Sequence, residues 1–296
     1  MQTIGFVGAS GLMGRGMALN IAKAGFDLRY TVHSSPVEGL AALGAVQAGS
    51  YAQLGADCDA VLVCVTSADD VERVVAGPDG LLTSPRPGLI IVDSSTSEPA
   101  TTLRLAELAA ATGVRFVDAP LTRGPTEAQE GRLNVIVGAD DETFAEVATL
   151  LGTFAENIFR AGPTGAGHTV KLLNNFCVQA AATGLAEAFG VAAKVGADPQ
   201  VLVDVLAAGM FDNALLHIME KTLSGDYEGM TFMLDNARKD VRYYTRLAAG
   251  RGVPSVVGDG VHEALTIASA LGYGQEFVPS LVRAQEKLNG VTIAGA

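Results

Sequence analysis

The segment Ile4-Gly-Phe-Val-Gly8-Ala-Ser-Gly11-Leu-Met-Gly14 decides the fold of this chain. It begins with an apolar run typical of a strand, and the Ala-rich stretch 14–24 that follows predicts a helix ending at Gly25. Glycines at a strand–helix turn let the backbone approach a pyrophosphate closely, and the N–H groups at the start of the helix favour its negative charge. We therefore interpret the turn as a dinucleotide-binding loop rather than a glycine-rich turn without a ligand. Its expected contact residues are Gly8, Ser10, Gly11, Leu12, Met13 and Gly14.

Outward from this turn, short apolar runs alternate with Ala-rich helical stretches as far as Gly162. The further strands that we predict are residues 28–32, 60–65, 89–92, 114–117 and 134–137. Alternating strands and helices predict a parallel sheet with right-handed crossovers. Beyond Gly162 the predicted elements are helices, over residues 169–195, 199–209, 232–250 and 260–271. We expect an α/β domain with a doubly wound parallel sheet over residues 1–162, and an all-helical domain over residues 163–296.

The chain has 296 residues, of which 49% are hydrophobic and 18% are charged. This composition supports a large core, and the length fits two domains of about 150 residues each. The formal net charge of −12 argues against binding to nucleic acid or to an anionic membrane surface. The N-terminus lacks the pattern of a signal peptide, and no uncharged apolar run reaches the roughly 18 residues of a membrane span. We therefore expect a cytoplasmic protein. The histidines show no metal-ligand spacing, so we expect no metal.

The end of the second predicted strand bears on the choice of cofactor. NAD-binding proteins tend to carry Asp or Glu there, which binds the ribose 2′-hydroxyl and repels a 2′-phosphate. Here the strand runs into His33, Ser34 and Ser35, which can donate hydrogen bonds to a phosphate, although no arginine accompanies them. The alternative is a polar turn that caps a helix. The cofactor is expected to be NADP or NAD, with NADP slightly favoured, and Val65 and Thr66 after a later strand are expected to line it.

A series of motifs runs along nearly the whole chain: Gly5-Phe-Val-Gly8 with Met13-Gly14, Val92-Asp-Ser-Ser-Thr96, Asp118-Ala-Pro-Leu-Thr-Arg-Gly124, Gly162-Pro-Thr-Gly165-Ala-Gly167, Lys171-Leu-Leu-Asn174-Asn175, and Phe232-Met-Leu-Asp-Asn-Ala-Arg-Lys239-Asp240. Taken in this order, the motifs resemble those of the β-hydroxyacid dehydrogenase family. The resemblance implies an N-terminal Rossmann-type domain followed by a helical domain. It also implies a homodimer or homotetramer built on the helical domain.

The resemblance gives several residues a role in hydride transfer. Lys171 matches the general acid/base, which protonates the oxygen of a carbonyl as hydride reaches its carbon. Asn174 and Asn175 follow at three and four residues, which places them on the lysine's side of a helix, where Asn175 can hold the lysine and Asn174 can bind substrate. The alternatives are a surface lysine and two ordinary polar helix residues. Ser95 and Thr96 match substrate contacts near the nicotinamide, and Lys239 matches a lysine near the cofactor.

Three polar residues lie outside these roles. His168, one turn before Lys171, is expected to support the site or to lie on the surface. Asp93 and Asp118 each end a predicted strand and are expected to cap loops without taking part in the chemistry.

The predicted substrate loop, Thr122-Arg123-Gly124, departs from the family pattern. A hydroxyl and neighbouring backbone N–H groups bind a substrate carboxylate in the family, and Arg123 stands where a glycine is usual. A guanidinium adds charge-assisted hydrogen bonds, which suit a distal carboxylate or sulfonate, and sulfolactaldehyde reductases resemble this chain in that arginine. The alternative is an outward-pointing Arg123 paired with an acid such as Glu127.

Together these observations predict an NAD(P)-dependent oxidoreductase of the β-hydroxyacid dehydrogenase type. Its expected substrate is a small anionic aldehyde, of the semialdehyde or sulfolactaldehyde type, interconverted with its hydroxy acid. The alternatives are an imine reductase, a class that usually lacks the catalytic lysine, and a nucleotide-binding protein without catalytic activity.

Overall fold

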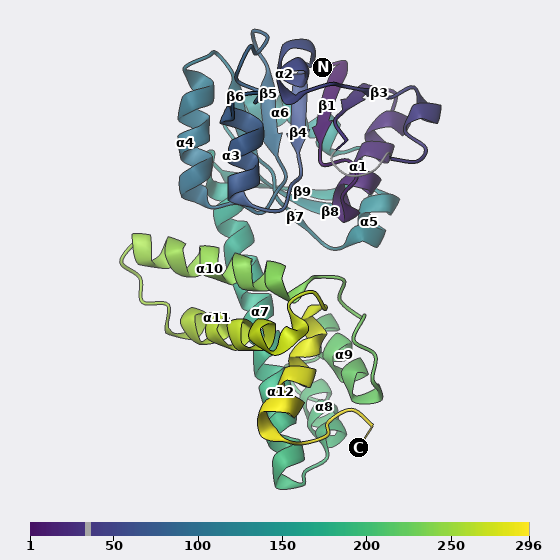
Figure 1. The fold of residues 1–296 in the computed structure, drawn as a ribbon, viewed down its shortest axis with the longest axis vertical. Coiled ribbons are helices and arrows are strands. Elements are labelled where there is room, and N and C mark those ends of the chain that lie inside the picture. Colours follow the sequence, from purple (N-terminus) through teal and green to yellow (C-terminus); the bar gives the residue numbers. More distant parts are fainter. Residues whose placement is uncertain (33–36, 296) are drawn as a thin grey trace. The chain divides into compact units, whose positions relative to one another are not determined.

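The computed structural model describes residues 1–32 and 37–295. The chain divides into two compact units, Met1–Lys171 and Leu172–Ala296 (Figure 1). The first unit ends in the opening turns of a long helix, beyond the domain boundary expected at Gly162. The backbone N–H groups of Gly165, just before this helix, and of His168, in its first turn, donate to the carboxylate of Asp118, which ties the start of the helix to the first unit.

The first unit is built on one twisted sheet with the strand order β3-β2-β1-β4-β5-β6-β8-β7, and β9 pairs with β8. The strands are β1 (Thr3–Val7), β2 (Asp27–Tyr30), β3 (Val46–Gln47), β4 (Ala60–Val63), β5 (Ile90–Asp93), β6 (Arg115–Asp118), β7 (Leu121–Thr122), β8 (Leu133–Gly138) and β9 (Ala155–Gly162). The strands predicted from apolar runs are all present, with ends shifted by at most a few residues. Strands β1 to β6 pair in parallel, as expected for alternating strands and helices.

The sheet is buried on both faces, which explains the continuous apolar runs. In β4, Leu62 belongs to a core cluster with α1 and α6, whereas its neighbours Val61 and Val63 belong to a cluster with α2, α3 and α4. Alternate side chains point to opposite faces, so a strand covered on both sides has no polar face. The helices are α1 (Leu12–Lys23), α2 (Tyr51–Asp57), α3 (Ala68–Ala76), α4 (Pro99–Ala110), α5 (Pro125–Glu130) and α6 (Asp141–Leu151), with a 3₁₀ turn at Ala41–Leu43.

The far edge of the sheet is mixed rather than parallel throughout. Strand β8 runs antiparallel to β6 and β7, and β9 runs parallel to β8. The short connection from β6 through β7 and α5 to β8 permits this reversal. The sequence did not predict β9, because its residues alternate irregularly between half-buried and exposed and give no apolar run.

The second unit is helical, and its described residues contain no strand. It comprises most of α7 (Ala166–Val195), with α8 (Pro199–Ala207), α9 (Ala214–Glu220), α10 (Leu234–Gly250), α11 (Val256–Ala268) and α12 (Leu281–Asn289), and short 3₁₀ or π turns at Lys221–Ser224, Ser269–Tyr273 and Val278–Ser280. The predicted helices are confirmed, whereas α9 and α12 were not predicted. Leu185, Phe189, Leu216 and Val241 are among the residues that fill its core.

Helix α7 is long and apolar enough to cross a membrane by length and composition alone, although no such span was expected. The same properties are typical of a core helix in a water-soluble protein. The side chains of Leu185, Ala186 and Phe189 are buried in the helical core, and the helix also carries Lys171 and Asn175. We therefore interpret α7 as a core helix.

Candidate functional site

The glycine loop joins β1 to α1, as predicted. Gly8 has a φ of +95°, and a Cβ atom at this position would lie 2.0 Å from the carbonyl oxygen of Cys64. A Cβ atom at Gly14 would lie 2.1 Å from the carbonyl oxygen of Gly8. Any other residue at either position would therefore push the loop apart, so the sequence requires these glycines for the close turn itself.

The start of α1 suits a phosphate group. Its N-cap residue is Gly11, which offers no side-chain acceptor, and its first turn holds no acidic residue. By contrast, Ser67 caps α3 and Asp140 caps α6 with their own side chains. N–H groups without an internal acceptor, together with the positive end of the helix dipole, favour a bound anion. The loop therefore fits the pyrophosphate of a dinucleotide, with Ser10, Leu12 and Met13 beside it as predicted contacts.

Of the other predicted cofactor contacts, the structure describes Val65 and Thr66. His33, Ser34 and Ser35 lie outside the described residues. Val65 and Thr66 follow β4 at the carboxyl edge of the sheet, next to the end of β1. In an open α/β sheet, this is the point at which strand order reverses and ligands bind.

Ser95 links the loops after β4 and β5. Its side chain is 2% exposed, and its hydroxyl accepts a hydrogen bond from the N–H of Val65 and donates to the carbonyl of Val63. These partners give the hydroxyl a structural task in positioning Val65. The predicted contact of Ser95 with substrate remains a prediction, while its neighbour Thr96 is partly exposed.

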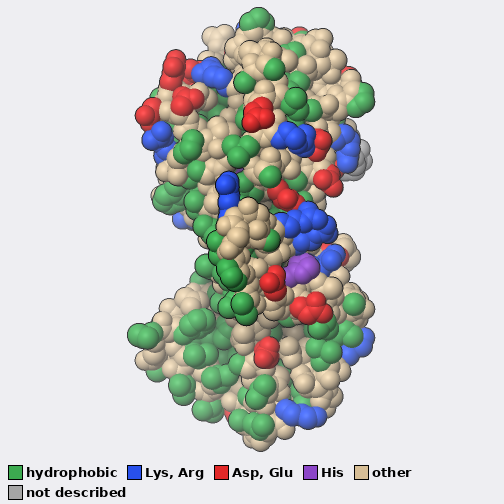
Figure 2. All heavy atoms as spheres, turned by 90° about the vertical axis from the view of Figure 1, so that its left-hand side faces the viewer, with side chains coloured by type: hydrophobic (Ala, Val, Ile, Leu, Met, Phe, Trp, Pro, Cys, Tyr) green, Lys and Arg blue, Asp and Glu red, His purple; other side chains and the backbone are tan. Residues whose placement is uncertain are grey.

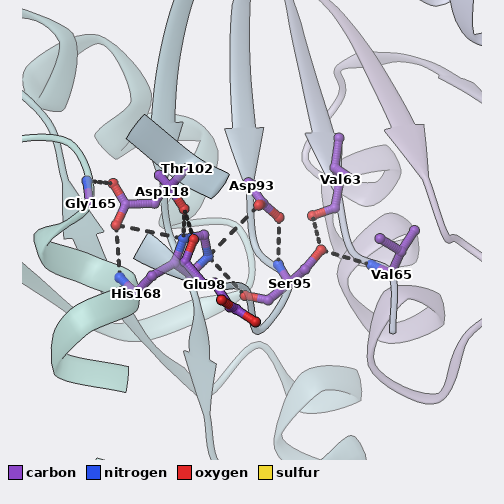
Figure 3. A network of polar contacts seen from close by, with 9 residues as sticks. All are labelled: Val63, Val65, Asp93, Ser95, Glu98, Thr102, Asp118, Gly165 and His168. Atoms are coloured by element: carbon purple, nitrogen blue, oxygen red, sulfur yellow. Dashed lines mark hydrogen bonds and ion pairs between the residues drawn. The ribbon is translucent and has the colours of Figure 1, made fainter. Parts of the chain in front are cut away.

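A fully buried histidine lies between two fully buried aspartates at the same edge (Figure 3). His168, Asp93 and Asp118 are each 0% exposed. The His168 Nε2 atom is 3.8 Å from an oxygen of Asp93, and its Nδ1 atom is 3.9 Å from an oxygen of Asp118. Nδ1 also lies 2.7 Å from the hydroxyl of Thr102, and Nε2 lies 3.1 Å from the carbonyl oxygen of Ser95. Of the two alternatives given for His168, a position on the surface is therefore wrong.

Both aspartates cap loops, as expected. Asp118 accepts hydrogen bonds from the N–H groups of Gly165 and His168. Gly138 and Gly167 make room for this carboxyl, because a Cβ atom at either would lie less than 3.0 Å from it. Asp93 accepts from the N–H of Ser95 through Oδ1, while its Oδ2 has no hydrogen-bond partner.

Burial raises the pKa of Asp93, and the nearby His168 ring opposes that shift. The sequence signal for this cluster was an acid at the end of each of two buried strands, since a buried carboxyl requires partners.

Lys171 extends from α7 one turn after His168 and is half-buried. Asn174 and Asn175 follow it on the same helix, on neighbouring positions of one side. The Asn174 Nδ2 atom donates to Asn175 Oδ1 over 3.1 Å. The helical spacing predicted for these residues is confirmed, whereas their roles in catalysis remain predictions.

Asp240 on α10 organises a second polar cluster, in the helical unit. Its carboxylate accepts from Asn175 Nδ2 at 2.6 Å and from Lys239 Nζ at 2.7 Å. Asp240 is 2% exposed and Lys239 is 20% exposed, with the lysine nitrogen 4.9 Å from the centre of the Tyr243 ring. Sequence reasoning named Lys239 and Asn175 but gave Asp240 no role, although it positions both.

In the predicted substrate loop, the groups expected to bind an anion are paired with acidic side chains of the protein itself. Arg123 pairs with Glu156 on β9 and donates to the carbonyl of Arg132, and the Gly124 N–H donates to the carboxylate of Glu127. Thr122 accepts from the side chain of Asn134. The alternative of an acidic partner for Arg123 is therefore what the structure contains, with Glu156 in the place of Glu127. Its role in binding a substrate anion remains a prediction.

The backbone of this loop is strained at Arg123. Arg123 has a φ of +74°, the left-handed conformation that glycine adopts most easily. A glycine at this position would adopt the conformation without strain. Among the residues that the structure describes, no group of three or more His, Cys, Asp or Glu side chains is placed to hold a metal ion.

Two family models match the chain. Residues 3–162 match the NAD binding domain of 6-phosphogluconate dehydrogenase, and residues 165–284 match the NAD-binding domain of NADP-dependent 3-hydroxyisobutyrate dehydrogenase. The chain is 30% identical over 295 residues to the 2-(hydroxymethyl)glutarate dehydrogenase of Eubacterium barkeri, covering 99% of this chain and 97% of that protein.

Solved structures agree with the family models. The 3-hydroxyisobutyrate dehydrogenase of Mycobacterium tuberculosis, solved with L-serine, matches with a TM-score of 0.84 and 25% identity, over 96% of this chain and 98% of that one. An imine reductase from a Pseudomonas species is more distant, with a TM-score of 0.58 and 17% identity over 96% of this chain and 99% of that one, and shares the fold alone. This chain belongs to the β-hydroxyacid dehydrogenase family and is an NAD(P)-dependent oxidoreductase.

Proposed function

We propose that this protein interconverts a small anionic aldehyde, of the semialdehyde or sulfolactaldehyde type, and its hydroxy acid, with Lys171 as the general acid/base. The observation that carries the proposal is the attachment of the Lys171 turn to the ligand-binding edge of the sheet. His168, one turn earlier, is fixed to the ends of β5 and β6 by Ser95 and Asp118. In sheets of this kind, ligands bind beyond the carboxyl ends of the strands.

The bound dinucleotide would supply or accept the hydride. The proton would be transferred by the protein. Lys171 Nζ would give its proton to the carbonyl oxygen during reduction and take it back during oxidation. Asn175, held by Asp240, would orient the lysine head, and Asn174 would bind substrate. Thr122, Arg123 and Gly124 would bind the distal anion. For this, Arg123 would exchange Glu156, or Gly124 would exchange Glu127, for the substrate.

An anionic substrate has further support from the relative in Eubacterium barkeri, whose name gives a hydroxymethylglutarate, a compound with two carboxylates. NADP is favoured slightly over NAD as the cofactor of this chain. The support is the absence of an acid at His33–Ser35 and the family model drawn from an NADP-dependent enzyme.

A homodimer or homotetramer in the cytoplasm belongs to the same proposal. Hydrophobic side chains are spread over the surface of the helical unit, in the lower part of Figure 2. A groove between α7 and α8 is lined by Gly184, Val191, Leu202 and Val205, among others. Val191 and Val205 are both largely exposed, and a second copy of the chain would cover them. Light scattering after gel filtration gives the mass that tests this.

The experiment that tests the function is a steady-state screen with NADPH and NADH against succinic semialdehyde, tartronate semialdehyde, 3-sulfolactaldehyde, a neutral aldehyde and a cyclic imine. We expect turnover of the anionic aldehydes. Lys171→Ala should lower kcat by about 10²–10⁴-fold, the range for acid–base groups, while the Kd for NADPH stays unchanged. The matched control is Lys194→Ala, at the far end of the same helix, where Lys194 donates to the carbonyl of Asn289.

Three results would redirect the proposal. Turnover of the imine without turnover of the aldehydes would favour an imine reductase. Tight NADPH binding without any turnover would favour a nucleotide-binding protein without catalysis. Retained turnover in Lys171→Ala would remove the lysine from the mechanism.

A further inference from the structure

The hydrogen bonds around His168 place a proton on Nε2 and leave room for a second one on Nδ1. The Nε2 atom faces the carbonyl oxygen of Ser95 at 3.1 Å, and a carbonyl only accepts, so Nε2 carries a proton. The Nδ1 atom faces the hydroxyl of Thr102 at 2.7 Å, and this hydroxyl lies 3.2 Å from the carbonyl of Glu98. A threonine has one hydroxyl proton, and when it goes to Glu98 the oxygen must accept from Nδ1. In that arrangement the ring is protonated on both nitrogens, whereas a hydroxyl that donates to Nδ1 would leave the ring neutral and the Glu98 carbonyl bonded to the Thr102 N–H alone.

The charges that face the ring favour the state in which both nitrogens are protonated. Asp93 at the end of β5 and Asp118 at the end of β6 are the acidic side chains within 4 Å of it in the described structure, and α4 contributes the Thr102 hydroxyl. Asp118 has two N–H donors, but Asp93 Oδ2 has none. Beside a neutral ring, an ionised Asp93 would have no countercharge and its Oδ2 no donor, which is costly in a dry interior, whereas an imidazolium supplies the countercharge that opposes protonation of this carboxyl.

The charged ring lies where it can hold several segments near the predicted site in place. Through Ser95 it holds the loop that carries Thr96, through Thr102 it holds the start of α4, and its own backbone N–H binds Asp118. Lys171 follows on α7 with one turn between them. One side chain thus joins two strand ends and a helix to the turn from which the predicted acid/base extends.

We propose that His168 is a positioning residue, held as an imidazolium between Asp93 and Asp118, that fixes the Ser95–Thr96 loop and the Lys171 turn for hydride transfer. The kinetic part of this inference rests on the function proposed above, whereas the charge of the ring does not. Loss of the imidazolium would leave substrate binding largely intact and would misplace the reacting groups, for which losses of up to about 100-fold are typical.

The charge can be tested by ¹⁵N NMR on the full-length protein labelled at its histidines. His168→Gln assigns the signals of the ring by their disappearance. At pH 8 we expect two protonated and exchange-protected ring nitrogens, because the carboxyls of Asp93 and Asp118 face the ring. A neutral ring with one protonated nitrogen would overturn the proposal, whatever substrate the enzyme uses. If no aldehyde is reduced, the proposed function fails while this measurement still decides the charge.

The positioning role can be tested with two substitutions at Thr102. Thr102→Val keeps the shape but removes the acceptor for Nδ1, and should give a neutral ring at pH 8 and a kcat about 10- to 100-fold lower. KM and the Kd for NADPH should change less than about threefold. Thr102→Ser keeps the hydroxyl and should restore both the NMR signature and kcat. An unchanged kcat in a folded Thr102→Val, or a Thr102→Ser as impaired as Thr102→Val, would overturn the positioning role.

Discussion

The two polar clusters of this protein differ in their access to water. In the first unit, Asp93, Asp118 and His168 are completely buried, and most of their hydrogen bonds go to the backbone. In the helical unit, Asp240 is buried, but its partner Lys239 is 20% exposed. A sealed cluster fixes the backbone around it, whereas a cluster open on one side can exchange a partner for a ligand.

The energetics of the two clusters follow from this difference. Buried charges need countercharges and complete hydrogen bonding, so the first cluster tolerates little change in volume or in donors. In the second cluster water can replace a lost partner, so that a substitution costs less stability. We therefore expect substitutions in the first cluster to cost more stability than substitutions in the second, although both clusters position groups for the reaction.

The strongest test of the sealed cluster is Gly167→Ala. The new Cβ atom would lie 2.5 Å from the carbonyl oxygen of Ile136 and 2.9 Å from that of Asp118. Since neither backbone can yield easily, we expect a loss of about 2–3 kcal/mol in the free energy of unfolding, measured with urea. The control is Gly260→Ala within helix α11, where no atom lies within 4 Å. It should gain about 0.5–1 kcal/mol, because alanine favours helices. Similar effects of the two substitutions would contradict the tight fit of Gly167.

Asp240→Asn tests the open cluster. Asn175 donates to Oδ2 of the carboxylate and Lys239 to Oδ1, and an asparagine replaces one of these oxygens with an NH2 group that would face a donor. We expect about tenfold lower kcat, because Asn175 loses its fixed orientation, and a loss of stability near 1 kcal/mol. The matched control is Asp259→Asn on α11, because Asp259 is exposed. A loss of stability as large as that of Gly167→Ala, with kcat unchanged, would reverse the assigned difference between the clusters.

The parts of the fold that the sequence predicted depend on local rules. The β4 run is apolar because both faces of the sheet are covered, and the glycine loop follows from the space that Gly8 and Gly14 must leave empty. The spacing of Lys171, Asn174 and Asn175 was readable because an α-helix repeats every 3.6 residues.

What the sequence did not predict depends on contacts between distant segments. Residues far apart in the chain, Thr102 and His168, meet only in the folded first unit. The pairing of Arg123 with Glu156 requires β9, an edge strand without an apolar pattern. Asp240 received no role because nothing in its own helix reveals that Asn175 lies opposite.

The choice of cofactor is a test in which a smaller effect is expected. An added carboxylate at the end of the second strand would repel the 2′-phosphate of NADPH and accept hydrogen bonds from the ribose of NADH. We expect wild type to use NADPH at least as well as NADH, and His33→Asp to shift the ratio of kcat/KM values toward NADH by about tenfold, or 1.4 kcal/mol. His33→Asn, which adds no charge, is the control. A wild type that strongly prefers NADH would rule out the predicted preference for NADP.

The smallest effects are expected at the Arg123–Glu156 pair, which is exposed and should therefore exchange with a ligand as the open cluster does. Arg123→Gly loses an ion pair that contributes about 0–1 kcal/mol, and it relieves a left-handed backbone that costs a non-glycine residue about 1 kcal/mol or more. These terms offset each other, so the free energy of unfolding should change by less than about 1 kcal/mol. Any larger kinetic effect then reports on binding rather than on folding.

The kinetics of the pair separate substrate recognition from structure. If Arg123 binds the distal anion, Arg123→Gly should lower kcat/KM for succinic semialdehyde and 3-sulfolactaldehyde by about tenfold relative to a neutral aldehyde. Glu156→Gln breaks the same ion pair but leaves the guanidinium available, so it should lower KM for the anionic aldehydes by about two- to threefold. Opposite signs in the two variants would mean that Glu156 holds the place of a substrate anion. Equal changes for anionic and neutral aldehydes would mean that the pair serves only to join β9 to the substrate loop.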